Sequence, residues 1–184
     1  MMEKSVAAVV EKMGHVDAFY CIRLNRWIRD ANLHRFFSTI SRLGDGVFWY
    51  SLMFLFPVFM GAEGFVITAL MILMAAWGVY VYRLIKKRSM RPRPFVSYRS
   101  IRQGARTLDF YSFPSGHTMH AVAFAILLTY AVPSLGVVLL PFAALTALAR
   151  VVLGLHYPSD VFMGAVLGMV NGIVMLNVFG SFLQ

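Results

Sequence analysis

The sequence predicts an all-α membrane protein, a polytopic bundle of five or six transmembrane helices with an amphipathic N-terminal helix at the membrane interface. Of the 184 residues, 59% are hydrophobic and only 14% are charged, whereas soluble domains contain about 45–50% apolar and about 25% charged residues. Five apolar runs follow the N-terminal segment. We expect one domain, residues 1–184, with an amphipathic segment at 1–42 and a transmembrane core at 43–184.

The first 45 residues carry charge throughout, which argues against a membrane crossing in this segment. Leu24, Trp27, Ile28 and Ala31 recur at helical spacing, a pattern typical of a helix that lies on the membrane surface. The sequence RLGDG, Arg42 to Gly46, then predicts a turn.

The five apolar runs cover residues 47–61, 65–85, 117–132, 135–153 and 161–182. A spanning helix needs about 20 apolar residues, so the first and third runs need flanking residues to complete a crossing. With five crossings, residues 1–46, 86–116 and 154–160 lie on one side of the membrane. The candidate functional groups are therefore expected on that side.

The net charge is +9, and eight basic residues fall in one connector, where Asp109 alone opposes them: Lys86, Lys87, Arg88, Arg91, Arg93, Arg99, Arg102 and Arg106. A basic excess fits a nucleic acid, an anionic membrane surface or a phosphorylated substrate. Because this connector lies between two membrane spans, nucleic acid is the weakest of these interpretations. Lys87, Arg88 and Arg91 are expected to be anchors that snorkel at a helix end.

Lys86 and Arg93 lie seven residues apart, and Pro94 follows Arg93. For these two residues we favour phosphate binding over anchoring. The planar guanidinium of Arg matches phosphate oxygens with a fork of donors, and Lys supplies a point charge.

The sequence PSGH, Pro114 to His117, opens the third apolar run. One interpretation is an ordinary turn followed by a solvated histidine without a functional role. Its functional interpretation is an anion site, since the first N–H groups of a helix have no intrahelical partner and lie at the positive end of its dipole. An oxyanion would then meet the Ser115 hydroxyl and the amides of Gly116 and His117.

The sequence RVVLGLHYPSD places Arg150, His156 and Asp160 at fixed intervals. A charge such as Arg150 at the end of an apolar span is costly unless it lines a functional cavity. If Pro158 lies in the first turn of the last helix, Asp160 can hydrogen-bond one ring nitrogen of His156 and leave the other free to attack. A capping Asp beside an interfacial His is an equally good interpretation of this motif alone.

Together, Lys-x6-Arg-Pro, Pro-Ser-Gly-His and Arg-x5-His-x3-Asp resemble the three-part signature of the type-2 phosphatidic acid phosphatase superfamily, in order and in spacing, over roughly residues 42–165. The strings SRLGDG and HYPSD also resemble bacterial members. One departure is Ala149, which stands where the third motif usually has a Ser. Its loss removes one hydroxyl donor and leaves the other groups in place.

The resemblance implies a role for each matching residue. It implies that the phosphoryl oxygens are bound by five residues: Lys86, Arg93, Ser115, Gly116 and Arg150. It further implies that His156 attacks phosphorus to form a phosphohistidine, with Asp160 holding its ring, and that His117 protonates the leaving oxygen as a general acid. Water then releases phosphate.

No metal and no cofactor is expected. Three cations around a transferring phosphoryl group can supply the electrostatic stabilisation that other phosphatases draw from metals. Carboxylates are scarce on this side of the membrane, with Asp109 and Asp160 near the motifs and Asp45 expected further off. His120 follows His117 by three residues and could line the site, but a packed or interfacial histidine is the favoured interpretation.

The function expected from the resemblance is an integral membrane phosphatase for a lipid phosphomonoester or pyrophosphate. Undecaprenyl pyrophosphate, phosphatidylglycerophosphate, phosphatidic acid and lipid A phosphates all fit. The alternative is a non-enzymatic membrane protein whose basic connector binds anionic lipid head groups. The expected partners are the lipid substrate and membrane lipids, and no nucleic acid.

The expected location is the bacterial inner membrane, with the active site on the periplasmic or extracellular face. The positive-inside rule would place the basic connector in the cytoplasm. We follow the resemblance, because Lys86 and Arg93 are assigned to phosphate rather than to topology.

Overall fold

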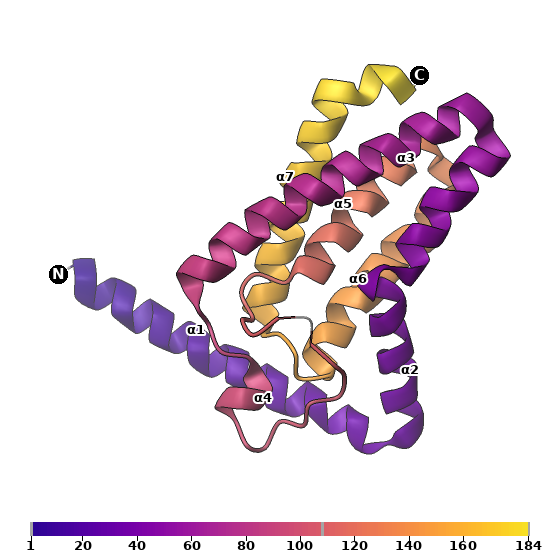
Figure 1. Ribbon diagram of the computed structural model, residues 1–184. Coiled ribbons are helices and arrows are strands. Elements are labelled where there is room, and N and C mark those ends of the chain that lie inside the picture. Colours follow the sequence, from indigo (N-terminus) through magenta and orange to yellow (C-terminus); the bar gives the residue numbers. More distant parts are fainter. Residues whose placement is uncertain (1, 108, 184) are drawn as a thin grey trace.

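The described chain is built from helices and connectors, which confirms the predicted all-α class (Figure 1). The computed structural model describes residues 2–107 and 109–183. Its α-helices are α1 (Met2–Asn25), α2 (Ala31–Arg42), α3 (Phe48–Ser89), α4 (Pro94–Ser97), α5 (Gly116–Ala131), α6 (Gly136–Val152) and α7 (Pro158–Phe179). Short helical turns occupy Arg26–Arg29, Leu43–Val47, Pro133–Leu135 and Gly180–Leu183.

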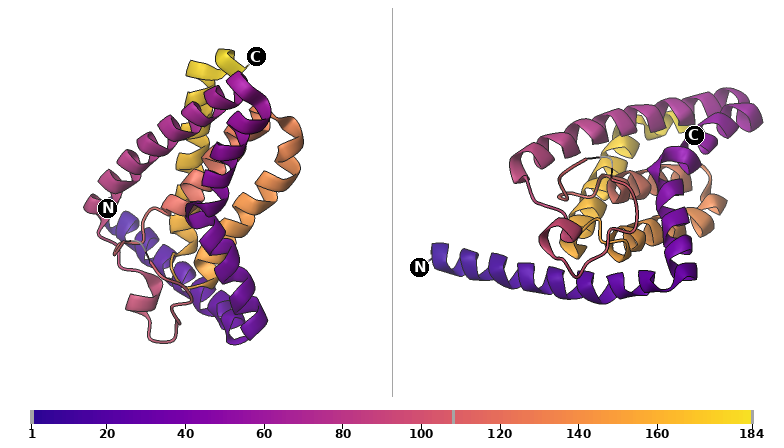
Figure 2. Two further views of the ribbon diagram at one scale, coloured as in Figure 1. Left: turned by 45° about the vertical axis from the view of Figure 1, so that its right-hand side comes forward. Right: turned by 60° about the horizontal axis from the view of Figure 1, so that its bottom comes forward.

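The N-terminal segment forms two helices, and the break between them falls inside the predicted apolar face at Leu24 to Ala31. Asp30 caps α2, because its Oδ1 accepts hydrogen bonds from the N–H groups of Asn32 and Leu33, both at 2.9 Å. Helix α1 crosses one end of the bundle (Figures 1 and 2). Asn25 ties it there, since its Nδ2 donates to the carbonyl of Val152 at 3.0 Å.

Helix α3 contains the first two predicted crossings as a hairpin. Gly61 reverses the chain with a φ of 57°, in the left-handed region that favours glycine. The two halves then pack closely: a Cβ on Gly64 would collide with the carbonyl of Phe56. The Thr68 hydroxyl donates to the carbonyl of Met53 at 2.8 Å across the hairpin.

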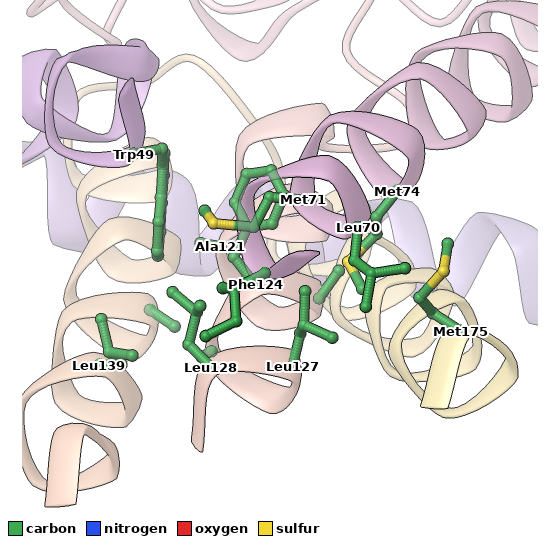
Figure 3. Packing of buried hydrophobic residues seen from close by; sticks show 14 of the residues in the cluster. Trp49, Leu70, Met71, Met74, Ala121, Phe124, Leu127, Leu128, Leu139 and Met175 are labelled. Carbon is green, nitrogen blue, oxygen red and sulfur yellow. The ribbon is translucent and has the colours of Figure 1, made fainter. Parts of the chain in front are cut away.

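Helix α5 lies in the middle of the bundle, packed against α3, α6 and α7. Small residues let α7 approach it: a Cβ on Gly164 would lie 2.5 Å from the carbonyl oxygen of Ser115, and one on Gly168 equally close to that of Met119. Figure 3 shows the apolar core around α5, to which α3 contributes Trp49, Leu70, Met71 and Met74, α5 contributes Ala121, Phe124, Leu127 and Leu128, α6 contributes Leu139, and α7 contributes Met175.

The outer surface of the bundle is apolar, as expected of a membrane protein. Three stretches are long and apolar enough to cross a membrane: Ala31–Ser89, Pro133–Val152 and Pro158–Leu183. Large hydrophobic side chains are exposed around them, among them Phe54, Phe59, Val137, Phe162 and Val178. In water such a surface would be an aggregation site, whereas lipid chains solvate it.

The polar connectors gather at one end of the bundle. Helix α1, α4 and the connector between α3 and α5 lie at this end, and the C-terminus and the reversal of α3 lie at the other (Figures 1 and 2). Residues far apart in sequence thereby lie at the same end of the bundle, as the count of five crossings predicted.

Candidate active site

Four buried polar residues from the first and third motifs define the site. Relative exposure is 6% for Lys86, 2% for Arg93, 1% for Arg150 and 1% for His156. Buried charges are costly unless they are paired or hydrogen-bonded. The partners of these groups therefore reveal what the site is built to hold.

Asp109 bridges Lys86 and Arg93. Lys86 Nζ donates to Asp109 Oδ1 at 2.9 Å and Oδ2 at 2.8 Å, and to the carbonyl of Tyr111 at 2.9 Å. Arg93 Nη2 donates to Asp109 Oδ1 at 2.7 Å. Burial alone would raise the pKa of the Asp109 carboxyl, but the hydrogen bonds and charges of Lys86 and Arg93 outweigh it and hold that pKa below its ordinary value. An ionised carboxylate thus lies on the two cations.

Arg150 is buried and only partly satisfied. Its Nη1 donates to Ser41 Oγ at 2.6 Å and lies 3.3 Å from Asp45 Oδ1. Its Nε and Nη2 have no hydrogen-bond partner among the described residues. Unpaired buried donors on a charged group cost free energy, so two donor nitrogens are available to an anion.

The start of α5 lies as the PSGH motif predicts, with Ser115 as the N-cap. The Ser115 hydroxyl is engaged within the helix, since it accepts from the Thr118 N–H at 3.4 Å and lies 2.9 Å from Thr118 Oγ1. Gly116 is the first residue of α5, and the Tyr82 ring lies 3.4 Å from the position that a Cβ on Gly116 would take. A larger residue would press on that ring at the helix start.

His156 lies in the short connector between α6 and α7, next to Arg93. Its Nε2 is 3.3 Å from Arg93 Nη1, and its Nδ1 is 3.7 Å from Asp160 Oδ2. Burial, and then the charges of Arg93 and Arg150, hold the pKa of His156 well below its ordinary value. The ring is therefore neutral at neutral pH and can offer a nitrogen lone pair.

The hydrogen bond expected between Asp160 and His156 is not formed in this structure, because 3.7 Å exceeds hydrogen-bond distance. Pro158 does begin α7, as predicted. Asp160 is engaged at this helix start: its Oδ2 accepts from the Tyr157 N–H at 2.8 Å and its Oδ1 from Arg91 Nη1 at 2.7 Å. Asp160 thus faces His156 Nδ1 at ion-pair distance while it caps α7.

Two interpretations of charged residues need correction. Arg91 was expected to be a surface anchor, but it bridges Asp17 and Asp160 at 2.7 Å each and lies 4.0 Å from the centre of the Tyr157 ring. Burial opposes its charge, yet Asp160 and Asp17 raise the pKa of Arg91 overall. Asp17 lies on α1, so the N-terminal helix supports the third motif. Lys87, by contrast, is exposed as expected of an anchor.

The second correction concerns Asp45, which was expected further from the motifs. Asp45 Oδ1 lies 2.6 Å from His117 Nε2 and 3.3 Å from Arg150 Nη1, so this carboxylate is part of the site. The signal in the sequence was the RLGDG turn, which precedes the first crossing on the side of the membrane that holds the motifs.

His120 is packed, as expected. Its Nδ1 lies 2.8 Å from the carbonyl of Gly116 and its Nε2 lies 3.3 Å from that of Ala75. Among the side chains that the structure describes, residues 14–107 and 109–183, no group of three or more His, Cys, Asp or Glu could hold a metal ion.

A cavity of about 210 Å³ opens beside the charged groups. Polar residues line one part of it: Asp45, Lys86, Asp109, His117 and His120. Its other walls are largely apolar and come from both halves of α3 and from α5: Trp49, Met53, Ala75, Val79 and Phe124. The site is therefore amphiphilic, with cations beside an apolar pocket.

Comparison with known proteins gives matches at the level of sequence. The family model of the PAP2 superfamily matches residues 64–182. The decaprenylphosphoryl-5-phosphoribose phosphatase of Mycobacterium tuberculosis is 39% identical over 99 residues, which cover 53% of each chain. The undecaprenyl-diphosphatase BcrC of Bacillus subtilis is 33% identical over 97 residues, which cover 53% of this chain and 50% of BcrC. The chain thus spans about half the length of the curated relatives it matches.

Two crystal structures share the fold. Aquifex aeolicus LpxE superimposes with a TM-score of 0.73 at 27% identity, covering 85% of this chain and 92% of LpxE. A transmembrane PAP2-type phosphatidylglycerolphosphate phosphatase from Bacillus subtilis gives a TM-score of 0.74 at 22% identity, covering 91% of this chain and 86% of the other. The second likeness concerns the fold alone.

Asp109→Asn is predicted to strengthen the binding of inorganic phosphate. The native carboxylate competes with an anion for Lys86 and Arg93, and hydrogen bonds to charged groups contribute about 1.5–3 kcal/mol. We expect the dissociation constant to fall about tenfold, which corresponds to about 1.4 kcal/mol. Isothermal titration calorimetry on purified protein measures it, with Glu63→Gln at the reversal of α3 as the matched control. Unchanged or weaker binding by Asp109→Asn would contradict the competition.

Proposed function

This chain belongs to the PAP2 superfamily, and from that premise we propose that it is an integral membrane phosphatase that hydrolyses a phosphomonoester or pyrophosphate of a lipid. The observation that carries the proposal is the buried Arg150, which keeps two donors without a partner among the described residues beside His156 and the other two cations. A bound phosphoryl group supplies the acceptors that these donors lack. On substrate binding, Lys86 and Arg93 would replace their hydrogen bonds to Asp109 with hydrogen bonds to substrate oxygens.

The proposed reaction has two steps. In the first, His156 Nε2 attacks phosphorus, the bond to the lipid oxygen breaks, and His117 gives a proton to that oxygen. Nε2 is the better candidate because Nδ1 faces Asp160, whose charge favours a proton there. In the second, water attacks the phosphohistidine with His117 as the base, and phosphate and free His156 are released. Lys86, Arg93 and Arg150 offset the charge on the equatorial oxygens in both steps.

The amphiphilic cavity supports a lipid phosphate as the substrate. Its apolar walls come from both halves of α3 and from α5, and Lys86 lines the same cavity, so a lipid chain would be buried there while its phosphate meets Lys86. The matching relatives from Mycobacterium tuberculosis and Bacillus subtilis are named for decaprenyl and undecaprenyl compounds. We therefore place polyprenyl phosphates and diphosphates ahead of phosphatidylglycerophosphate and phosphatidic acid.

A phosphate-release assay over a panel of polyprenyl and diacyl lipid phosphates and diphosphates tests this proposal. We expect release by the wild type and a loss of at least about 1,000-fold in His156→Ala, since removal of a nucleophile has effects of that size or larger. His15→Ala, on the exposed face of α1, is the matched control and should retain full activity. Equal release by wild type and His156→Ala would refute the mechanism. Lipid binding without release by the wild type would favour the head-group-binding alternative.

The proposed location is the bacterial cytoplasmic membrane, with the site on its outer face. Native Cys21 is a poor probe of this because it is buried, and burial raises the pKa of its thiol. Gln103→Cys places an exposed thiol on the connector that carries the first motif, and Ser181→Cys places one near the C-terminus at the other end.

We expect a membrane-impermeant maleimide to label Gln103→Cys in intact cells and Ser181→Cys only after permeabilisation. The opposite pattern would place the site in the cytoplasm.

A further inference from the structure

Asp45 is a charged member of the site that belongs to none of the three motifs. It lies outside residues 64–182, which the family model matches. Its Oδ1 is 2.6 Å from His117 Nε2 and 3.3 Å from Arg150 Nη1, so one oxygen contacts both the histidine of the second motif and the arginine of the third.

The local backbone places Asp45 next to His117 and Arg150. Gly46 has a φ of 136°, which residues with a side chain rarely adopt, and a Cβ there would lie 2.6 Å from the Tyr50 ring. Gly44 packs on α6, where its Cβ would lie 3.0 Å from Thr146 Cγ2. The two glycines thus bend the chain between α2 and α3 and press it against α6.

Ser41 contacts the same guanidinium from the end of α2. Its Oγ accepts from Arg150 Nη1 at 2.6 Å, and it lies one helical turn before Asp45. Both residues therefore hold Arg150 Nη1, which leaves Nε and Nη2 for an anion. The segment before the first crossing thus contributes two contacts to Arg150.

We propose that Asp45 is the positioning residue for the general acid His117, a role that rests on the proposed phosphatase function. Asp45 accepts the Nε2–H of His117 and fixes the ring, so that Nδ1 carries the proton that moves to the leaving oxygen. When the P–O bond breaks, Nδ1–H gives its proton to that oxygen, while Nε2 keeps its proton and its hydrogen bond to Asp45. In the second step Nδ1 takes a proton from the attacking water, which restores the imidazolium.

A carboxylate is the group that this position requires. The His117 imidazolium would lie beside the Arg150 guanidinium, and like charges at short range repel. Asp45 lies within 3.3 Å of a nitrogen of each and offsets both. An amide would keep the shape and lose that charge, which makes Asp45→Asn the informative variant.

The test compares two leaving groups in the purified full-length protein. The leaving group of an alkyl phosphate is an alkoxide, which needs a proton. The leaving group of 4-nitrophenyl phosphate is a stable phenolate, which does not. For Asp45→Asn we expect kcat/KM to fall about 100-fold more on a long-chain alkyl phosphate than on the aryl phosphate, since general acid catalysis contributes about 100- to 10,000-fold. The loss of the contact with Arg150 lowers both rates alike and cancels in this comparison. His117→Asn should give the same pattern, and the double variant should be no worse than His117→Asn.

Glu63→Gln is the matched acid-to-amide control and should leave both rates unchanged, because Glu63 is exposed at the reversal of α3. An equal loss on both substrates, or no loss, would overturn the role of Asp45 while the phosphatase function stands. A wild type that hydrolyses neither substrate would overturn both proposals.

A second readout does not depend on activity. In protein labelled with ¹⁵N-histidine, the hydrogen-bonded Nε2–H of His117 should give a downfield proton resonance that is lost in both Asp45→Asn and His117→Asn. A resonance that persists in Asp45→Asn would place the partner of His117 elsewhere.

Discussion

The burial of three cations at one end of an apolar bundle is the constraint on which the rest of this structure depends. Lys86, Arg93 and Arg150 come from the end of α3, the connector after it and the end of α6. Charges with so little water contact must be paired or must await an ionic ligand. Asp109 accepts hydrogen bonds from the first two, and Asp45 lies 3.3 Å from a nitrogen of the third. Two donor nitrogens of Arg150 remain without a partner among the described residues, and an oxyanion would supply the acceptors that they lack.

The scaffold keeps these groups together through close contacts between helices. Gly164 lets α7 touch the start of α5, where the Ser115 N–H donates to the carbonyl of Asp160 at 3.0 Å and links the second motif to the third. Helix α1 adds a brace from outside the crossings, because Asp17 holds Arg91 and Arg91 holds Asp160. A segment expected only to lie on the membrane is thus connected, by two ion pairs, to the start of α7, which follows the connector that carries His156.

The sequence predicts this architecture well where one-dimensional patterns suffice. The apolar runs at 47–61 and 65–85 correspond to the two halves of α3, and the short glycine-containing segment between them, GAEG, is where Gly61 reverses the chain. Motif spacing placed His156 and Arg93 together, and the structure brings their nitrogens to 3.3 Å. Asp45 and Arg91 were misjudged for one reason: their partners, Arg150 and Asp17, are distant in sequence, and charge patterning along a chain does not report which carboxylate a buried cation will meet.

The proposed mechanism requires a covalent bond between phosphorus and His156. Rapid quenching of the protein during turnover of a ³²P-labelled lipid phosphate, followed by peptide mapping under alkaline conditions that preserve phosphohistidine, tests it most directly. We expect an acid-labile phosphate on the peptide that contains His156, and no phosphate on the corresponding peptide of His156→Ala. Turnover by the wild type with no covalent phosphate, or with phosphate on a different residue, would contradict the account.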